Sequence, residues 1–330
     1  MNILKHKTNN QKTKTDCRIG DLRKKNMKNT PQQLHIPVLL SSVLDLLSPK
    51  QGETYLDLTA GYGGHARQVI ARIGGANLAT LVDRDNFAIE HLADLKEQGA
   101  RLIHADFLAA AKELVEADKQ FDMILLDLGV SSPQFDMAER GFSFAKDAPL
   151  DMRMDRLQSL TAAEIVNRWP EKELNKIFVQ YGEESPKLAA KFAREIVWQR
   201  KKKPLRTTTE LAELIRIETG RADGGKFHKI HPATKAFQGL RIAVNDELGQ
   251  LEATLPFLPR LLCPGGRLAV ISFHSLEDRI VKSFLKNEAG GGLESEIHIL
   301  TKHPIKGESD DVNNPRARSA KLRAAAKINK

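Results

Sequence analysis

The sequence predicts an α/β protein: a parallel sheet with an all-helical domain inserted into it. Three observations predict this architecture. Short apolar runs alternate with stretches of helical periodicity up to residue 128, strand-like runs almost disappear between residues 136 and 235, and an apolar run returns at 266–273. Strands and helices that alternate at this spacing form a parallel sheet covered on both faces. A helical block between two parts of one sheet is best explained as an insertion.

The apolar runs place the expected strands in order. They cover residues 54–59, 77–82, 101–104, 121–128 and 266–273, and the last follows the breaker Cys263-Pro264-Gly265-Gly266. Helical spacing follows the first strand as far as residue 73 and the second over residues 86–97. The inserted block contains four expected helices, at residues 162–169, 171–181, 187–200 and 208–218.

These elements divide the chain into three parts. Residues 1–33 are polar and lack periodic apolar positions, so they are predicted to be a disordered basic extension. Residues 34–135 and 236–330 are expected to form one discontinuous sheet domain. Residues 136–235 are expected to form the inserted helical domain.

The ends of the chain are basic, and the body is not. The formal charge is +9, but residues 1–30 hold nine Lys or Arg against two Asp, and residues 312–330 hold six and no acid. The body therefore holds 36 cations against 40 acids, a net charge of −4. Basic ends of this kind attract polyanions such as nucleic acid. The alternative is that they are merely solvated tails.

Composition excludes several classes of protein. Hydrophobic residues make up 41% of the chain and charged residues 28%, as in soluble domains. No apolar stretch reaches the roughly 18 residues that cross a bilayer. Two cysteines, Cys17 and Cys263, cannot build a disulfide framework or a cysteine-rich zinc site. We expect a cytoplasmic protein with no membrane partner.

A glycine-rich turn follows the first expected strand. Gly61, Gly63 and Gly64 let the backbone approach a ligand at the N-terminus of the next helix. With Ala66 the turn also fits the dinucleotide fingerprint. A nicotinamide-dependent oxidoreductase is therefore an alternative at this point, as is a tight turn without a ligand.

Acidic residues end the first three expected strands. Asp57 lies four residues before Gly61, Asp83 ends the second strand, and Asp106-Phe107 ends the third. In an open α/β sheet these ends meet at the edge where ligands bind. In a methyltransferase a carboxylate at the position of Asp57 lies near the methionine end of S-adenosylmethionine. In such an enzyme Asp83 could accept both ribose hydroxyls, and Asp106-Phe107 could hold adenine. A single acid there is often a helix cap, but three in register favour a ligand.

The fourth expected strand ends in Asp127-Leu128-Gly129-Val130-Ser131-Ser132-Pro133-Gln134. Many enzymes that methylate an exocyclic amino group place an Asp/Asn/Ser-Pro-Pro-aromatic tetrad here, and its acceptors bind the amino N–H groups. This segment departs from the tetrad, because no aromatic residue directly follows Pro133. Its position at the end of the fourth strand still supports methyl transfer to nitrogen. Asp127, Ser131 and Ser132 are candidates for orienting a base. The alternative is a polar loop that caps a helix.

Several longer motifs give the sequence a resemblance to a known family. Besides the glycine turn with His65 and the segment after Asp127, they are His35-x-Pro37-Val38-Leu39-Leu40, Glu139-Arg140-Gly141-Phe142-Ser143-Phe144, Pro149-Leu150-Asp151-Met152-Arg153-Met154-Asp155, His231-Pro232-Ala233-Thr234 with Phe237-Gln238 and Leu240-Arg241-Ile242, Ser272-Phe273-His274-Ser275-Leu276-Glu277-Asp278-Arg279, and Asn314-Pro315-Arg316-Ala317-Arg318-Ser319. From about residue 35 to the end, the chain resembles the bacterial 16S ribosomal RNA (cytosine-N4)-methyltransferase family. Ala148 and Lys235 depart from the residues usual in that family, Gly and Arg.

The resemblance implies a Rossmann-like class I methyltransferase sheet that binds S-adenosylmethionine and an inserted helical domain that recognises substrate. It implies methylation of N4 of a cytosine in the decoding region of 16S rRNA, with the small ribosomal subunit as partner and a homodimer as a further expectation. The matched cofactor contacts are Gly63, Gly64, His65, Asp83, Phe107, Asp127 and Gln134. None of the matched positions indicates a metal.

Five further residues are candidates for substrate contact: Arg140, Phe142, Arg241, Asn245 and His274. The first two combine charge with an aromatic ring, as on a base-stacking surface, although core packing is the alternative for the ring. The next two lie one turn apart on an expected helix, and the last follows the final strand, where capping is the alternative. Weaker candidates for phosphate contacts are Lys201-Lys202-Lys203, Arg316, Arg318 and Arg323.

Two other functions stay open from the residues themselves. One is a methyltransferase that acts on another amino-bearing base of a nucleic acid. The other is an RNA-binding assembly factor with a degenerate cofactor pocket. Retention on immobilised S-adenosylhomocysteine rather than on NAD would separate a methyltransferase from a nicotinamide enzyme.

Overall fold

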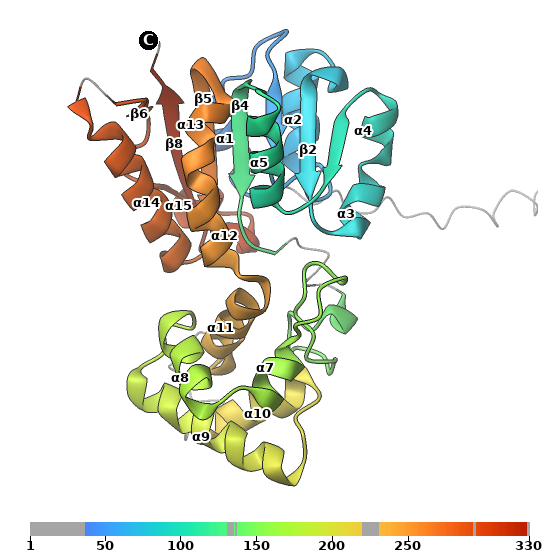
Figure 1. Ribbon diagram of the computed structural model, residues 1–330, viewed down its shortest axis with the longest axis vertical. Helices are drawn as coiled ribbons and strands as arrows, with labels where there is room; N and C mark the ends of the chain where they lie inside the picture. The colour runs from blue at the N-terminus through green and yellow to red at the C-terminus, as the bar shows by residue number, and fades with distance from the viewer. Residues whose placement is uncertain (1–36, 131–134, 136, 220–230, 293–294, 329–330) are drawn as a thin grey trace, which may run out of the picture. The chain divides into compact units, whose positions relative to one another are not determined.

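The computed structural model, which describes residues 37–130, 135, 137–219, 231–292 and 295–328, contains one mixed sheet with helices packed around it (Figure 1). Its strands run in the order β3-β2-β1-β4-β5-β8-β6, and β7 pairs with β8. The strands are β1 (Tyr55–Asp57), β2 (Ala79–Asp83), β3 (Arg101–His104), β4 (Phe121–Asp127), β5 (Leu262–Ser272), β6 (Ile297–Ile299), β7 (Ile305–Lys306) and β8 (Lys321–Lys327).

The first five strands are parallel, which confirms the predicted sheet. β4 illustrates why this sequence forms a central strand. Met123 and Leu125 lie in the core on one face, and Ile124 and Leu126 lie in the core on the other. A strand that is buried on both faces needs a continuous apolar run rather than an alternating one.

Helices cover both faces of the sheet (Figure 1). One core is built with α1 (Leu40–Leu47), α2 (Gly64–Ile73) and α4 (Ala93–Glu97), and the other with α5 (Phe107–Glu116), α12 (Glu247–Thr254), α13 (Leu258–Leu261) and α14 (Ser275–Ala289). The expected helix over residues 86–97 is divided at Leu92 into α3 (Asn86–His91) and α4. None of the described helices is both long and apolar enough to cross a membrane.

A third core lies among helices that pack against one another rather than against the sheet. It is formed by α7 (Ala162–Arg168), α8 (Glu171–Gln180), α9 (Pro186–Lys202), α10 (Thr208–Glu218) and α11 (Ala233–Asn245). The local signals for these helices are clear. Thr207 and Glu210 form a capping box at the start of α10, and the Ser185 side chain caps α9 ahead of Pro186. The four helices expected in this block are therefore present.

Two expectations about the C-terminal part were wrong. The breaker Cys263-Pro264-Gly265-Gly266 does not precede β5 but lies inside it, because the pairing with β4 jumps from Phe121–Leu262 to Met123–Arg267 and so absorbs the extra residues. The basic tail is no free arm either. Its residues 321–327 form β8, which pairs antiparallel with β5 and β6.

The cations of the tail are largely used inside the protein. Arg323 is buried and its Nε donates to Asp278 at 2.7 Å, and Lys321 Nζ lies 3.3 Å from the same carboxylate. The Lys327 ammonium donates to the carbonyls of Pro259 and Leu262. These three side chains stabilise the sheet edge, so the expectation that Arg323 contacts phosphate was wrong.

Candidate active site

The glycine turn after β1 brings the backbone to the carboxyl edge of the sheet. Gly61 and Gly63 adopt φ values of +52° and +79°, which favour glycine. A Cβ on Gly63 would lie 2.9 Å from Leu92 Cδ2, and one on Gly64 would lie 2.8 Å from Pro37 Cγ. From a Cβ on Gly61 the nearest atom of the described residues would be the Thr59 carbonyl oxygen, 3.9 Å away. Packing therefore demands Gly63 and Gly64, while among the described residues the surface over Gly61 is open to a ligand.

Asp83 ties the end of β2 to this turn. Its Oδ2 accepts the backbone N–H of Gly61 and its Oδ1 accepts that of Asp85, both at 2.8 Å. Burial raises the pKa of Asp83, and these two hydrogen bonds oppose that effect. Each carboxylate oxygen retains a further lone pair, so Asp83 can still accept hydroxyl groups.

Asp57 is a buried carboxylate at the end of β1. It is 1% exposed; the Tyr55 hydroxyl donates to its Oδ2 at 2.7 Å, and the Thr59 N–H donates to its Oδ1 at 3.1 Å. Burial raises the pKa of Asp57 to about 6, although these hydrogen bonds favour the ionised form and nearby Asp83 disfavours it. Part of the Asp57 population is therefore neutral near pH 6, and a nearby positive ligand would favour its ionisation.

Replacing Asp57 by Asn is expected to flatten the pH dependence of stability. The pKa of Asp57 is about 6 in the folded protein and 3.8 ordinarily, so protonation of Asp57 favours the folded state. This contribution to stability is fully present below pH 3.8 and is lost as pH rises through 6. The whole loss is about 3 kcal/mol. Urea unfolding without cofactor measures the free energy of unfolding of both proteins between pH 4.5 and 8. As pH rises, this free energy should increase in the variant relative to the parent protein. Exposed Asp45→Asn is the control; equal slopes for all three proteins would contradict the expectation.

Asp127 ends β4 with an unusual environment. Its Oδ2 lies 3.6 Å from Nδ1 of buried His65, whose Nε2 donates to the Val38 carbonyl at 3.0 Å. Its Oδ1 is buried and has no hydrogen-bond partner among the described residues. Burial raises the pKa of Asp127 well above its usual value, and the charges of Asp57 and Glu277 add to this. A buried oxygen without a donor points to a ligand that supplies one.

The predicted adenine end is built differently from the other two strand ends. Asp106 caps α5, because its Oδ1 accepts the Ala109 N–H at 2.8 Å, and this is the alternative already recognised for an isolated acid. Phe107 is the first residue of α5 and packs partly buried against the core. Three other predicted site residues, Ser131, Ser132 and Gln134, lie outside the described residues.

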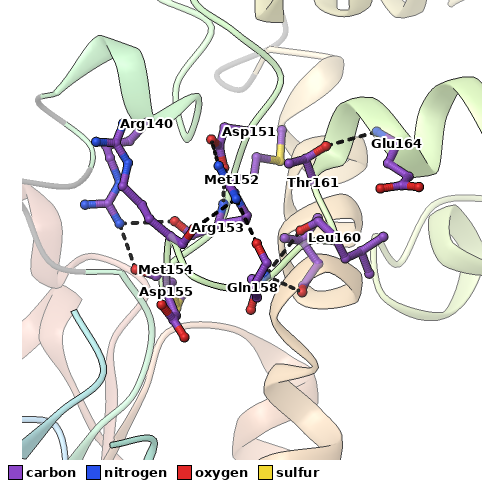
Figure 2. A network of polar contacts seen from close by, with 12 residues as sticks. Arg140, Asp151, Met152, Arg153, Met154, Asp155, Gln158, Leu160, Thr161 and Glu164 are labelled. Atoms are coloured by element: carbon purple, nitrogen blue, oxygen red, sulfur yellow. Dashed lines mark hydrogen bonds and ion pairs between the residues drawn. The ribbon is translucent and has the colours of Figure 1, made fainter. Parts of the chain in front are cut away.

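Arg140 is not a base-stacking residue in this structure. It is 2% exposed, forms a 3.0 Å ion pair with buried Asp85, and donates to the carbonyls of Arg153 and Met154. Figure 2 shows its guanidinium directed toward the loop that carries Met154. Phe142 is 6% exposed and belongs to the helical core. The expectation of direct substrate contact is corrected for both, because Arg140 is buried with both terminal guanidinium nitrogens hydrogen-bonded internally.

Arg241 and Asn245 are also held by internal contacts. Arg241 makes two 2.8 Å hydrogen bonds to the carboxylate of Glu247. Asn245 is 2% exposed, donates to the Met152 carbonyl and accepts the Met154 N–H, both at 2.8 Å. The one-turn spacing was correct, but neither side chain is left for phosphate or base: Arg241 pairs with Glu247, and Asn245 fastens the 152–154 loop to α11.

His274 caps α14, which was the alternative to substrate contact. Its Nδ1 accepts the Glu277 N–H, while the Glu277 carboxylate accepts the N–H groups of Phe273 and His274. Glu247 lies with these two in one buried acidic cluster. Burial raises the pKa of Glu277, but the hydrogen bond and charge of His274, together with Arg241, outweigh it and lower the pKa. Arg241 balances the cluster from within, so we assign it no metal.

Sequence reasoning missed Asp85 and Glu277 as members of the site. Asp85 supplies the N–H that holds Asp83, caps α3 and pairs with Arg140. Glu277 is three residues after His274, the spacing of a capping box, and that signal was available. The pairing of Asp85 across 55 residues was not.

Comparison with known proteins gives the chain relatives along most of its length. A sequence profile of the MraW methylase family matches residues 32–328. Three curated proteins, each named ribosomal RNA small subunit methyltransferase H, align with 89% of this chain. The one from Synechocystis sp. is 48% identical over 304 residues, with 93% of that protein covered. The one from Heliobacterium modesticaldum is 44% identical over 316 residues and 98% covered, and the one from Trichormus variabilis is 47% identical over 298 residues and 92% covered.

Proposed function

Since the chain belongs to the MraW methylase family, we propose that it transfers the methyl group of S-adenosylmethionine to N4 of a cytosine in small-subunit ribosomal RNA. The observation that carries this proposal is the carboxylate edge of the sheet. Asp57, Asp83 and Asp127 end the neighbouring parallel strands β1, β2 and β4 around a glycine turn. This is the edge at which open α/β sheets bind their ligands.

S-adenosylmethionine fits this edge on two observations. Each carboxylate oxygen of Asp83 keeps a lone pair for a hydroxyl group beside its backbone hydrogen bond, and among the described residues the surface over Gly61 is open. The cofactor supplies a methyl group on a positively charged sulfur, which the nearby carboxylates would attract. The contacts we propose are Gly63, Gly64, His65, Asp83, Phe107, Asp127 and Gln134.

The task left to the protein is to orient a weak nucleophile. The lone pair of cytosine N4 is delocalised into the ring, so alignment with the methyl group controls the rate; good alignment contributes up to about 7–11 kcal/mol. We assign Asp127 Oδ1 as the acceptor for one N–H of the amino group. Ser131 and Ser132, outside the described residues, are proposed as further acceptors.

Asp127 also receives the proton that N4 loses. S-adenosylmethionine, when bound, would supply the methyl group that N4 displaces from its sulfur, and Asp127 Oδ1 would take up the amino proton that N4 loses. Burial and the charges of Asp57 and Glu277, which raise the pKa of Asp127, make this carboxylate a stronger base than an exposed one. His65, 3.6 Å from Asp127 Oδ2, keeps the carboxylate facing the turn.

The direct test uses labelled S-adenosylmethionine and small ribosomal subunits that lack the modification, with protein-free small-subunit rRNA in parallel. We expect label as N4-methylcytosine at one position, located by nuclease digestion and mass spectrometry. We propose that the assembled subunit is the better substrate. Tight binding of S-adenosylhomocysteine without transfer to either RNA would contradict the proposal and favour a non-catalytic assembly role.

A further inference from the structure

We propose that the exposed face of α9 is a docking surface for the sugar-phosphate backbone of RNA, with Trp198 as a stacking platform for a base. The inference rests on the proposed function, because an RNA substrate is what such a surface would hold. α9 carries six Lys or Arg and one Glu among its 17 residues. It packs against α8 and α10 in the helical block (Figure 1).

The cations and the tryptophan share one side of the helix, which we call the α9 stripe: Lys187, Lys191, Arg194, Trp198 and Lys201. At 3.6 residues per turn these positions lie within an arc of about 80° and extend over about 21 Å of helix. The opposite side is buried in the helical core through Ala189, Phe192, Ala193 and Ile196. Burial of that side holds the α9 stripe outward.

Three of the four stripe cations have no partner within the described part of the chain. Lys187, Arg194 and Lys201 make no hydrogen bond or ion pair with the residues that the structure describes. Lys191 is different, because its ammonium donates to the Glu218 carbonyl at 2.5 Å and lies 3.2 Å from the Glu218 carboxylate. Free cations in a row hold counterions that a polyanion displaces, which is the source of salt-dependent affinity for nucleic acid.

Trp198 distinguishes this surface from an ordinary solvated charge run. It is 50% exposed, and the Lys202 ammonium lies 3.0 Å from its ring centroid. Its stripe neighbours Arg194 and Lys201 are charged, so the α9 stripe on either side of the ring is cationic, whereas the centre of a protein–protein interface is depleted of charge. An exposed indole among cations is the arrangement on which single-stranded bases stack.

The test compares Lys187→Ala/Arg194→Ala/Lys201→Ala and Trp198→Ala with a control that removes the same charge elsewhere, Lys112→Ala/Lys119→Ala/Lys282→Ala, all exposed side chains. Binding to unmodified small ribosomal subunits is measured over a salt series, and S-adenosylhomocysteine affinity is measured alongside. We expect the stripe triple variant to lower the salt slope of log K by about 2 to 3. The Trp198→Ala variant should bind about tenfold more weakly. Cofactor affinity should stay unchanged throughout.

Each contrary outcome has a distinct meaning. If the triple variant keeps the affinity and salt slope of the parent protein, the inference is overturned, while methyl transfer by the parent leaves the proposed function standing. If the parent transfers no methyl group to subunits, the proposed function fails whatever the variants bind. If the stripe variants lose affinity for subunits but not for protein-free rRNA, the surface docks on a ribosomal protein and the assignment to RNA is wrong.

Discussion

Replacing Asp127 by Asn is expected to lower the rate of methyl transfer by about 100-fold or more. The carboxylate offers the amino group of the base an acceptor at Oδ1, which is buried and lacks a hydrogen-bond partner among the described residues. In the Asn variant either the amide NH2 group, a donor, or the amide oxygen, an acceptor, faces the amino group of the base. Neither group can take up the proton that N4 loses. A 100-fold loss corresponds to about 2.7 kcal/mol in the barrier.

Single-turnover transfer to small ribosomal subunits, with both substrates saturating, measures this effect without interference from product release. The matched control is Asp118→Asn, the same change at an exposed residue outside the site. Stability should not fall, because burial, Asp57 and Glu277 raise the pKa of Asp127 and its ionised form is already disfavoured in the folded protein. Full activity of Asp127→Asn with unchanged cofactor affinity would remove Asp127 from the mechanism.

Replacing Arg140 by Ala is expected to destabilise the protein by about 3–5 kcal/mol. The change removes the guanidinium beside buried Asp85 and two donors to the carbonyls of Arg153 and Met154. A buried carboxylate that loses its cation carries a desolvation cost that the folded state no longer offsets. Because Asp85 also donates its N–H to Asp83, we expect the KM for S-adenosylmethionine to rise as well.

Chemical denaturation of the full chain measures the loss, with Arg101→Ala as control. Arg101 forms a 2.8 Å ion pair with Glu113, but the two side chains are 45% and 57% exposed, so about 0–1 kcal/mol is expected. Arg140→Lys keeps the charge and should fall between the two. Equal losses in the alanine variants, or a KM that stays constant while stability drops, would show that Arg140 does not position the cofactor edge.

The strand ends are the part of the site that local pattern predicts well. Asp57, Asp83 and Asp127 follow apolar runs, and parallel strands bring their carboxyl ends to one edge whatever the details of packing. The glycine turn follows the same logic, since positive φ values are rare for other residues. These residues were predicted from period and position, and the structure brings their elements together.

The residues expected to contact substrate show where such reasoning stops. Arg140 beside Phe142 has the composition of a stacking surface, but the folded chain buries both. The run Lys321–Lys327 has the composition of a basic arm but forms β8. By composition alone, a cation used in a buried ion pair cannot be told from one left free on a surface.

By itself the sequence determined the parallel sheet, the glycine turn with its acidic strand ends, and the family to which its motifs belong. Periodicity and turn chemistry depend on neighbours within a few residues, and those are visible in the chain. Only the tertiary structure decided which cations form internal ion pairs. Arg140 pairs with Asp85 and Arg323 with Asp278, whereas Lys187 has no ion pair among the described residues. These ion-pair partners are 45 to 55 residues apart and meet only when the helices and the sheet pack. A cation that is buried in this way needs a partner to offset its desolvation and so stabilises the fold, whereas an exposed cation remains available for RNA.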